Sequence, residues 1–124
     1  MEKLELANTE DTPYLVLDKD NNKFEISGRS LPEDAFVFYA PIHEWLEAYV
    51  EDANSSTERI MNLDYFNSSS ARNIVEMLFI LEKITESGNE VKVIWLYKEE
   101  DDVMKGRGEE IESVVELPFE IKVI

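Results

Sequence analysis

The chain has 124 residues, 44% of them hydrophobic and 32% charged, and a formal net charge of −16. This length favours one domain, and the low content of four glycines and four prolines argues against a linker-rich or low-complexity chain. The acidity argues against a nucleic-acid binder, which needs a basic face to meet phosphates, and against binding to an anionic membrane surface.

The first elements are predicted to be a pair of strands. Residues 1–13 are polar and acidic, and we expect them to form a loose N-terminal lead-in. Residues 14–17 and 24–26 are short apolar runs, and the Asp- and Asn-rich stretch between them is typical of a turn. Together these runs and this turn predict a β-hairpin.

An aromatic helix is predicted next, over residues 35–50. Ser30 or Asp34 could cap its N-terminus. Pro41 cannot donate a helical hydrogen bond, so we expect a break near Ala40. Beyond the proline, apolar side chains recur at helical spacing and are expected to pack on a sheet. These side chains are Ile42, Trp45, Leu46 and Tyr49.

A strand, a long helix and a second strand are predicted in the middle of the chain. Residues 57–66 are typical of a strand, residues 69–87 of a helix closed by Gly88, and residues 91–97 of a β-branched and aromatic strand. The near-continuous apolarity of 91–97 predicts burial on both faces and a central position. The apolar stripe of the helix is wider than one sheet contact requires, so a second helix or a partner is expected to cover the excess.

The C-terminal part is predicted to be a charged loop at 98–108, a helix at 109–117 and a strand at 119–124. The complete order is then β-β-α-β-α-β-α-β. Strands and helices that alternate after an initial hairpin predict a mixed β-sheet with helices packed on it, in a single α/β domain of residues 14–124.

Several kinds of chemistry have little support. The absence of cysteine excludes disulfides, thiolate metal sites and a cysteine nucleophile. His43 is the only histidine, so a zinc site with Glu44 and Glu47 would lack the second His or Cys that such sites normally have. The hairpin turn imitates a calcium loop, but Lys23 and Arg29 stand where an EF-hand requires Gly and Glu. We therefore expect no metal and no cofactor.

The sequence also gives an expectation for location. The N-terminus has no apolar signal core, and no apolar run approaches the roughly 20 residues that span a bilayer. We expect a soluble, cytoplasmic protein.

Three consecutive serines at the junction of strand and long helix are the strongest candidate site. Asn67 or Ser68 could simply cap the helix, with the other serines tolerated in its first turn. The functional interpretation is phosphorylation of Ser68, because unpaired N–H groups and the positive end of the helix dipole would favour a phosphate there. Arg72, one turn on, could add a charged partner or could pair with Glu76 instead.

Segments along nearly the whole chain resemble the SiaC family of bacterial regulatory phosphoproteins, which are similar to STAS domains and anti-sigma factor antagonists. The matching segments are Gly28-Arg29-Ser30-Leu31-Pro32-Glu33, Phe38-Tyr39-Ala40-Pro41-Ile42 with Trp45-Leu46, Leu63-Asp64-Tyr65-Phe66-Asn67-Ser68-Ser69-Ser70, Val93-Ile94-Trp95-Leu96-Tyr97, and Pro118-Phe119. The resemblance implies a STAS-like fold without enzymatic activity.

The resemblance further implies a partner switch. In this family a dedicated kinase phosphorylates a hydroxyl in an Asn-Thr-Ser-Ser turn, and a PP2C-type phosphatase removes the phosphate. The unphosphorylated protein binds and activates a diguanylate cyclase, which makes cyclic di-GMP and controls biofilm or aggregation behaviour. The hydroxyl maps onto Ser68, where this chain has Ser in place of Thr, and Ser69 is the second choice.

The partner-binding surface is therefore expected around the N-terminus of the long helix. Its predicted residues are Tyr65, Asn67, Ser68, Ser69, Ser70 and Arg72. Two alternatives remain open. One is a constitutive protein-binding adaptor that uses exposed aromatic residues without any phosphorylation. The other is a small hydrolase or transferase in which His43 acts as the base for one of the serines, which requires hydrogen-bond reach between them.

Overall fold

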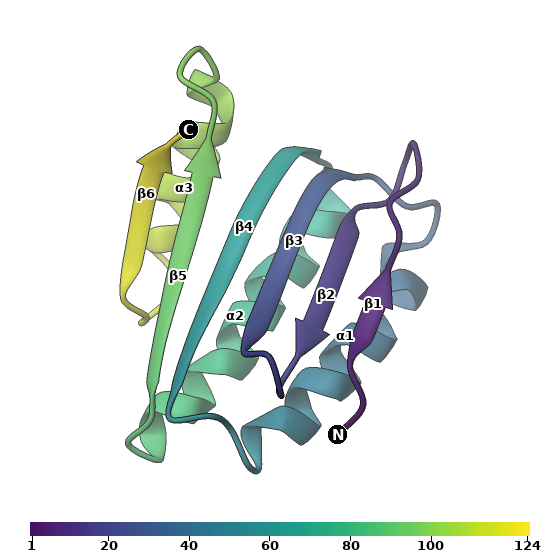
Figure 1. Ribbon diagram of the computed structural model, residues 1–124. Coiled ribbons are helices and arrows are strands. Elements are labelled where there is room, and N and C mark those ends of the chain that lie inside the picture. Colours follow the sequence, from purple (N-terminus) through teal and green to yellow (C-terminus); the bar gives the residue numbers. More distant parts are fainter.

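Six strands form one mixed sheet in the order β1-β2-β3-β4-β5-β6, and three helices pack on it (Figure 1). This arrangement comes from a computed structural model, which describes all residues from 1 to 124. The strands are β1 (Leu4–Leu6), β2 (Tyr14–Asp18), β3 (Lys23–Ser30), β4 (Ser56–Phe66), β5 (Glu90–Tyr97) and β6 (Phe119–Val123). The helices are α1 (Ala35–Val50), α2 (Ser68–Glu86) and α3 (Asp102–Glu112). The prediction of a mixed α/β sheet is confirmed.

β2 runs antiparallel to both of its neighbours, β1 and β3, whereas β3, β4, β5 and β6 run parallel to one another. Each parallel connection contains one helix, as crossovers in parallel sheets require. Figure 1 shows all three helices on the same face of the sheet, so the other face is not covered by any helix. None of the three helices has the length and apolarity needed to cross a membrane.

The N-terminal segment contains a strand that the sequence prediction missed. β1 pairs with β2, with Leu4 opposite Leu17, and so adds one strand to the predicted order. The indole Nε1 of Trp45 also donates a hydrogen bond to the carbonyl of Glu2 over 2.8 Å. The expectation of a loose lead-in over 1–13 is therefore wrong for residues 4–6, because a three-residue strand of alternating Leu and Glu is too short to give a pattern.

Helix α1 runs without interruption through Pro41, so the predicted break near Ala40 is wrong. Asp34 caps it by accepting a hydrogen bond from the N–H of Val37 over 3.2 Å. Burial explains the continuity: the side chains on the inner face have no exposed surface and hold the helix on the sheet and on α2 at either side of the proline. These side chains are Tyr39, Ile42, Leu46 and Tyr49.

Helix α3 replaces most of the predicted charged loop, and the predicted helix over 109–117 is confirmed only for its first residues. Asp101 caps α3 by accepting from the N–H of Met104 over 3.1 Å. Gly108 faces the indole of Trp95 so closely that a Cβ atom there would lie 2.5 Å from the ring. The indole Nε1 of Trp95 donates to the carbonyl of Met104 over 2.9 Å. This close packing fixes a helix that contains two glycines.

The core lies between the sheet and the helices, and one charged side chain is fully buried in it. Arg59 on β4 has no exposed surface. Its Nη2 lies 3.5 Å from the sulfur of Met77 on α2, while its Nε and Nη1 have no partner. Desolvation lowers the pKa of Arg59 to about 10, so the group remains charged at neutral pH.

Strand β5 is not central as predicted, since it lies next to the edge strand β6. Only the side chains that face the helices are fully buried on it, namely Val91, Val93 and Trp95. The near-continuous apolarity of this strand therefore reflects one buried face and one half-buried face.

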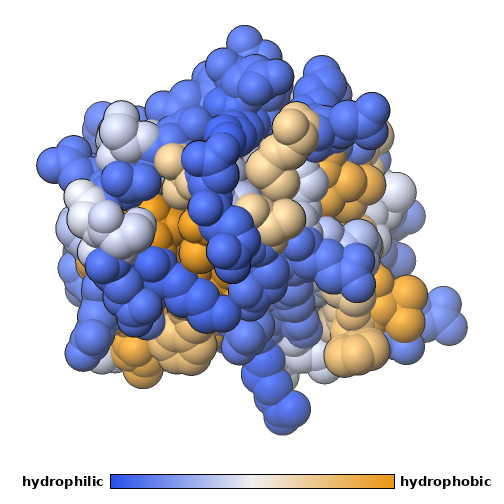
Figure 2. Space-filling model, turned by 90° about the horizontal axis from the view of Figure 1, so that it is seen from below, coloured by the Kyte–Doolittle hydropathy of each residue, from blue (hydrophilic) through white to orange (hydrophobic).

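All three helices begin at the same end of the sheet, because each follows the carboxyl end of a strand in the parallel part. Figure 1 shows this end at the top of the view. Figure 2 shows the opposite end, which is largely hydrophilic with separate apolar patches. The serine run belongs to the first end, beside the starts of α1 and α2.

Candidate regulatory site at the start of α2

Asn67 shapes the turn between β4 and α2. Its backbone is extended, with φ −87° and ψ 177°, and its side-chain oxygen accepts from the N–H of Ser70 over 2.9 Å. Its own N–H donates to the carbonyl of Ser30 on β3 over 3.1 Å. Asn67 is therefore the cap, and α2 begins at Ser68, one residue before the predicted start. The turn is held by hydrogen bonds on both sides of Ser68.

The three serines have different environments. Ser68 and Ser69 are exposed, whereas the side chain of Ser70 is fully buried. The Oγ of Ser70 lies 2.8 Å from the Oγ of Ser30, which lies 2.6 Å from the hydroxyl of Tyr39. The expectation that Ser70 contributes to a binding surface is therefore corrected: its hydroxyl joins α2 to β3 and α1 in the interior.

Tyr39 completes this buried cluster of hydroxyls. Burial raises the pKa of Tyr39, while its hydrogen bond to Ser30 acts in the opposite direction. The phenol consequently stays protonated and can donate to Ser30. The cluster of Ser30, Tyr39 and Ser70 holds the first turn of α2 rigidly, so the exposed hydroxyls of Ser68 and Ser69 project from a fixed backbone.

Two other predicted surface residues lie at the same end. Tyr65 is exposed, and the guanidinium of Arg29 lies 5.5 Å from the centre of its ring. Arg72 is exposed on the first turns of α2, and it makes no ion pair with Glu76. All five ion pairs of the chain use lysines, so the exposed arginines remain available to an external anion.

His43 is engaged elsewhere than with the serine hydroxyls. Its Nε2 lies 3.0 Å from the side-chain oxygen of Asn73, whose amide nitrogen donates to the carbonyl of Ser69 over 2.9 Å. The amide oxygen can only accept, so Nε2 carries the proton, and the other ring nitrogen is buried without a partner. No serine hydroxyl of the run hydrogen-bonds to His43. The geometry gives no direct contact for the hydrolase or transferase alternative.

Sequence reasoning missed three residues that shape this end. Ser30 and Tyr39 act through contacts with residues far away in the chain, which no local pattern shows. Arg107 was assigned to a loop, but on α3 its guanidinium lies 4.8 Å from the centre of the Phe66 ring, directly before the serine turn. The helical position of Arg107 could not be recognised from the sequence, because glycines on both sides of a residue usually indicate a break in a helix.

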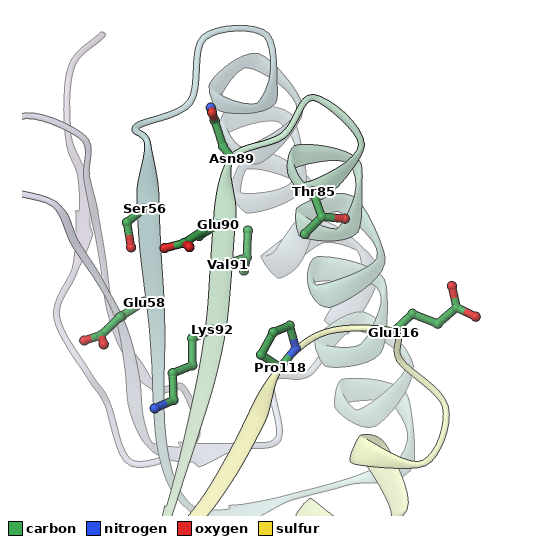
Figure 3. Close-up of a pocket in the computed structure, with 9 residues that line it drawn as sticks. All are labelled: Ser56, Glu58, Thr85, Asn89, Glu90, Val91, Lys92, Glu116 and Pro118. Carbon is green, nitrogen blue, oxygen red and sulfur yellow. The ribbon is translucent and has the colours of Figure 1, made fainter.

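A pocket lies at the opposite end of the molecule, where β4 and β5 begin and α2 ends (Figure 3). It has a volume of about 550 Å³, and its lining is mostly polar. The side chain of Glu116 points away from the pocket, and Lys92 is paired with Glu120 at 2.9 Å. No group of three or more His, Asp or Glu side chains in the structure is placed to hold a metal ion. This pocket therefore offers no metal site, and the start of α2 is the better candidate.

Comparisons with known proteins agree on one family. A family model described as SiaC family regulatory phosphoprotein matches residues 6–124. An uncharacterised protein of Pseudomonas aeruginosa strain UCBPP-PA14 is 25% identical over 122 residues, which cover 98% of this chain and 97% of the relative.

Solved structures show the same fold. Apo-SiaC from Pseudomonas aeruginosa superimposes with a TM-score of 0.90 at 25% identity, covering 98% of this chain and 99% of that one. A crystal structure of the diguanylate cyclase SiaD in complex with its activator SiaC, from the same organism, matches with a TM-score of 0.91, 25% identity and the same coverage. The resemblance drawn from the sequence is thereby confirmed.

Proposed function

Because the chain belongs to the SiaC family of regulatory phosphoproteins, we propose that it is a non-enzymatic switch whose partner binding depends on phosphorylation of Ser68. The observation that carries the proposal is the exposed hydroxyl of Ser68 on the first residue of α2, on a backbone held by Asn67 and Ser30. A kinase needs a hydroxyl that is accessible from solvent, and a switch needs the added phosphate to lie on the surface that the partner contacts.

The geometry supports a phosphate at this position without unfolding of the helix. The first N–H groups of an α-helix have no partner within the helix, and Asn67 satisfies that of Ser70. A phosphate on Ser68 would carry about −1.5 to −2 charges beside a dipole end of roughly +0.5. Arg72 lies one turn further along on the exposed side of α2, and since helical side chains generally point towards the N-terminus, its guanidinium would be within reach of a phosphate on Ser68.

The proposed output is a diguanylate cyclase, bound and activated by the unphosphorylated protein. Support comes from the complex of SiaD with its activator SiaC, which has the same fold as this chain. A cognate serine/threonine kinase and a PP2C-type phosphatase would set the phosphorylation state in the cytoplasm. Tyr65, Asn67, Ser68, Ser69 and Arg72 would lie at the partner surface, and Ser70 would support it from below.

The experiment that tests this proposal is phosphosite mapping. Protein isolated from its own host is measured by intact mass and peptide fragmentation, beside Ser68→Ala and, as a matched control, Ser69→Ala. We expect one phosphate that is lost only in Ser68→Ala. Loss only in Ser69→Ala would move the site by one residue, and absence of phosphate in every growth condition would favour the constitutive adaptor.

A further inference from the structure

An apolar groove lies between α2 and α3 and ends beside the serine turn. Its volume is about 220 Å³. Its apolar lining consists of Phe66, Ala71, Val75, Ile111 and Val114. Arg107 and Glu110 of α3 complete the wall.

The groove exists because α2 carries more apolar surface than its neighbours cover. Ala71, Val75 and Phe79 recur every four residues and so share one face of α2. On α3, Met104, Gly108 and Ile111 turn towards the sheet and are buried. Val114 lines the groove and remains 55% exposed. Phe79, one turn beyond Val75 on the same face of α2, remains 40% exposed. The excess apolar stripe predicted from the sequence is therefore real and only partly covered.

The size of the groove indicates what kind of occupant it can take. Pockets for small molecules usually measure about 300–1,000 Å³, so about 220 Å³ is small for a cofactor or metabolite. It is enough for one large apolar side chain, the kind of anchor that dominates protein interfaces. Two helices form its walls, and such a trough is suited to an amphipathic helix that presents apolar side chains at i, i+3 or i+4, and i+7.

The charge at the end of the groove points to an acidic residue on that helix. The guanidinium of Arg107 lies on the Phe66 ring, 4.8 Å from its centre, without a carboxylate partner. Arg107 is half-buried, whereas Arg72, on the first turns of α2 outside the groove lining, is exposed and also has no ion-pair partner. Free arginines at one end of a chain with net charge −16 are complementary to a carboxylate, with which arginine forms strong two-point hydrogen bonds.

We propose that this groove binds one helix of the output partner, with a large apolar side chain between α2 and α3 and a carboxylate against Arg107. The inference rests on the proposed function, since it takes the partner to be the diguanylate cyclase. Ser68 shares the helix face of Ala71 and Val75, three and seven residues on, and stands at the end of the groove. A phosphate there competes for the arginines and repels the partner's carboxylate, so it opposes binding.

The test uses the purified diguanylate cyclase of the same host and measures its dissociation constant with unphosphorylated protein. Val114→Glu places a charge at the groove. Val123→Glu is the matched control, because Val123 is 48% exposed on the edge strand β6 and does not line the groove. Arg107→Gln removes the charge while keeping a polar side chain of similar reach. Thermal unfolding of each variant shows that it is folded.

We expect Val114→Glu to weaken binding of the cyclase at least tenfold and Val123→Glu to change the affinity less than twofold. Arg107→Gln should weaken binding and also make the affinity less dependent on salt concentration. Equal affinity of the wild type and Val114→Glu would overturn the assignment of the groove as the binding site while leaving the proposed function intact. No binding of the wild type would overturn both. A change in the protein's own oligomeric state in Val114→Glu would assign the groove to a second copy of this chain and would also overturn the inference.

Discussion

The Oγ of Ser30 on β3 lies 2.8 Å from the Oγ of Ser70 on α2, although the two residues are 40 positions apart. The carbonyl of Ser30 also accepts from the N–H of Asn67. One residue of β3 thus holds both ends of the four-residue segment from Asn67 to Ser70. The exposed hydroxyls of Ser68 and Ser69 are presented by a segment that is fixed from below.

Ser70→Ala is expected to destabilise the protein by about 1–2 kcal/mol, because it removes one partner from a fully buried group of hydroxyls. The midpoint of urea unfolding measures this change. Ser69→Ala is the matched control: its side chain is exposed, so its expected effect is within about 0.5 kcal/mol. Equal effects of the two substitutions would mean that the buried hydroxyls contribute nothing to stability.

Gly108→Ala and Gly106→Ala are expected to act in opposite directions. A Cβ at Gly108 would lie 2.5 Å from the Trp95 indole, so Gly108→Ala should lower the free energy of unfolding by about 1–3 kcal/mol. A Cβ at Gly106 meets nothing within 4 Å. Gly106→Ala should therefore raise the free energy of unfolding by about 0.5–1 kcal/mol, because alanine has the higher helix propensity. Thermal unfolding of both variants distinguishes these effects, and stabilisation by Gly108→Ala would contradict the packing of α3 on β5.

These helix residues also show what the sequence could not predict. The strands β2 to β6, the helices α1 and α2 and the serine turn were predictable, because periodicity, capping residues and turn residues are local signals. α3 was largely missed, since its two glycines indicate a break and only the distant indole of Trp95 explains them. The burial of Ser70 was missed for the same reason, because its partners lie on β3 and α1.

Arg59→Met is expected to stabilise the protein by about 1–4 kcal/mol, since it replaces a buried and incompletely paired charge with an apolar side chain of similar length. Desolvation lowers the pKa of Arg59 to about 10 in the folded state, below the ordinary value of an arginine. The protonated group therefore destabilises the fold below about pH 10, and this cost decreases as the pH rises above that value.

The matching measurement is chemical unfolding of the wild type and Arg59→Met at pH 7 and near pH 11. The variant should be more stable at pH 7, and its advantage should be smaller near pH 11. A variant less stable than the wild type at pH 7 would show that the guanidinium has a stabilising role in the core that its single contact with Met77 does not explain.

The proposed switch predicts that negative charge at Ser68 weakens binding to the output partner, because the charge must lose water at the interface and meets the partner's own carboxylate. Ser68→Asp should reproduce part of this loss. Ser69→Asp is the matched control on the next exposed residue, and it should have the smaller effect if Ser68 is the residue that faces the groove. Equal losses would place the partner surface over both serines.

The most direct test of the switch is the dissociation constant of the host diguanylate cyclase for two forms of the purified protein, unphosphorylated and fully phosphorylated on Ser68. We predict that the phosphorylated form binds at least tenfold more weakly, which corresponds to about 1.4 kcal/mol. Treatment with a PP2C-type phosphatase should restore the original affinity. Equal affinities of the two forms would contradict the switch and would leave the protein as a constitutive adaptor.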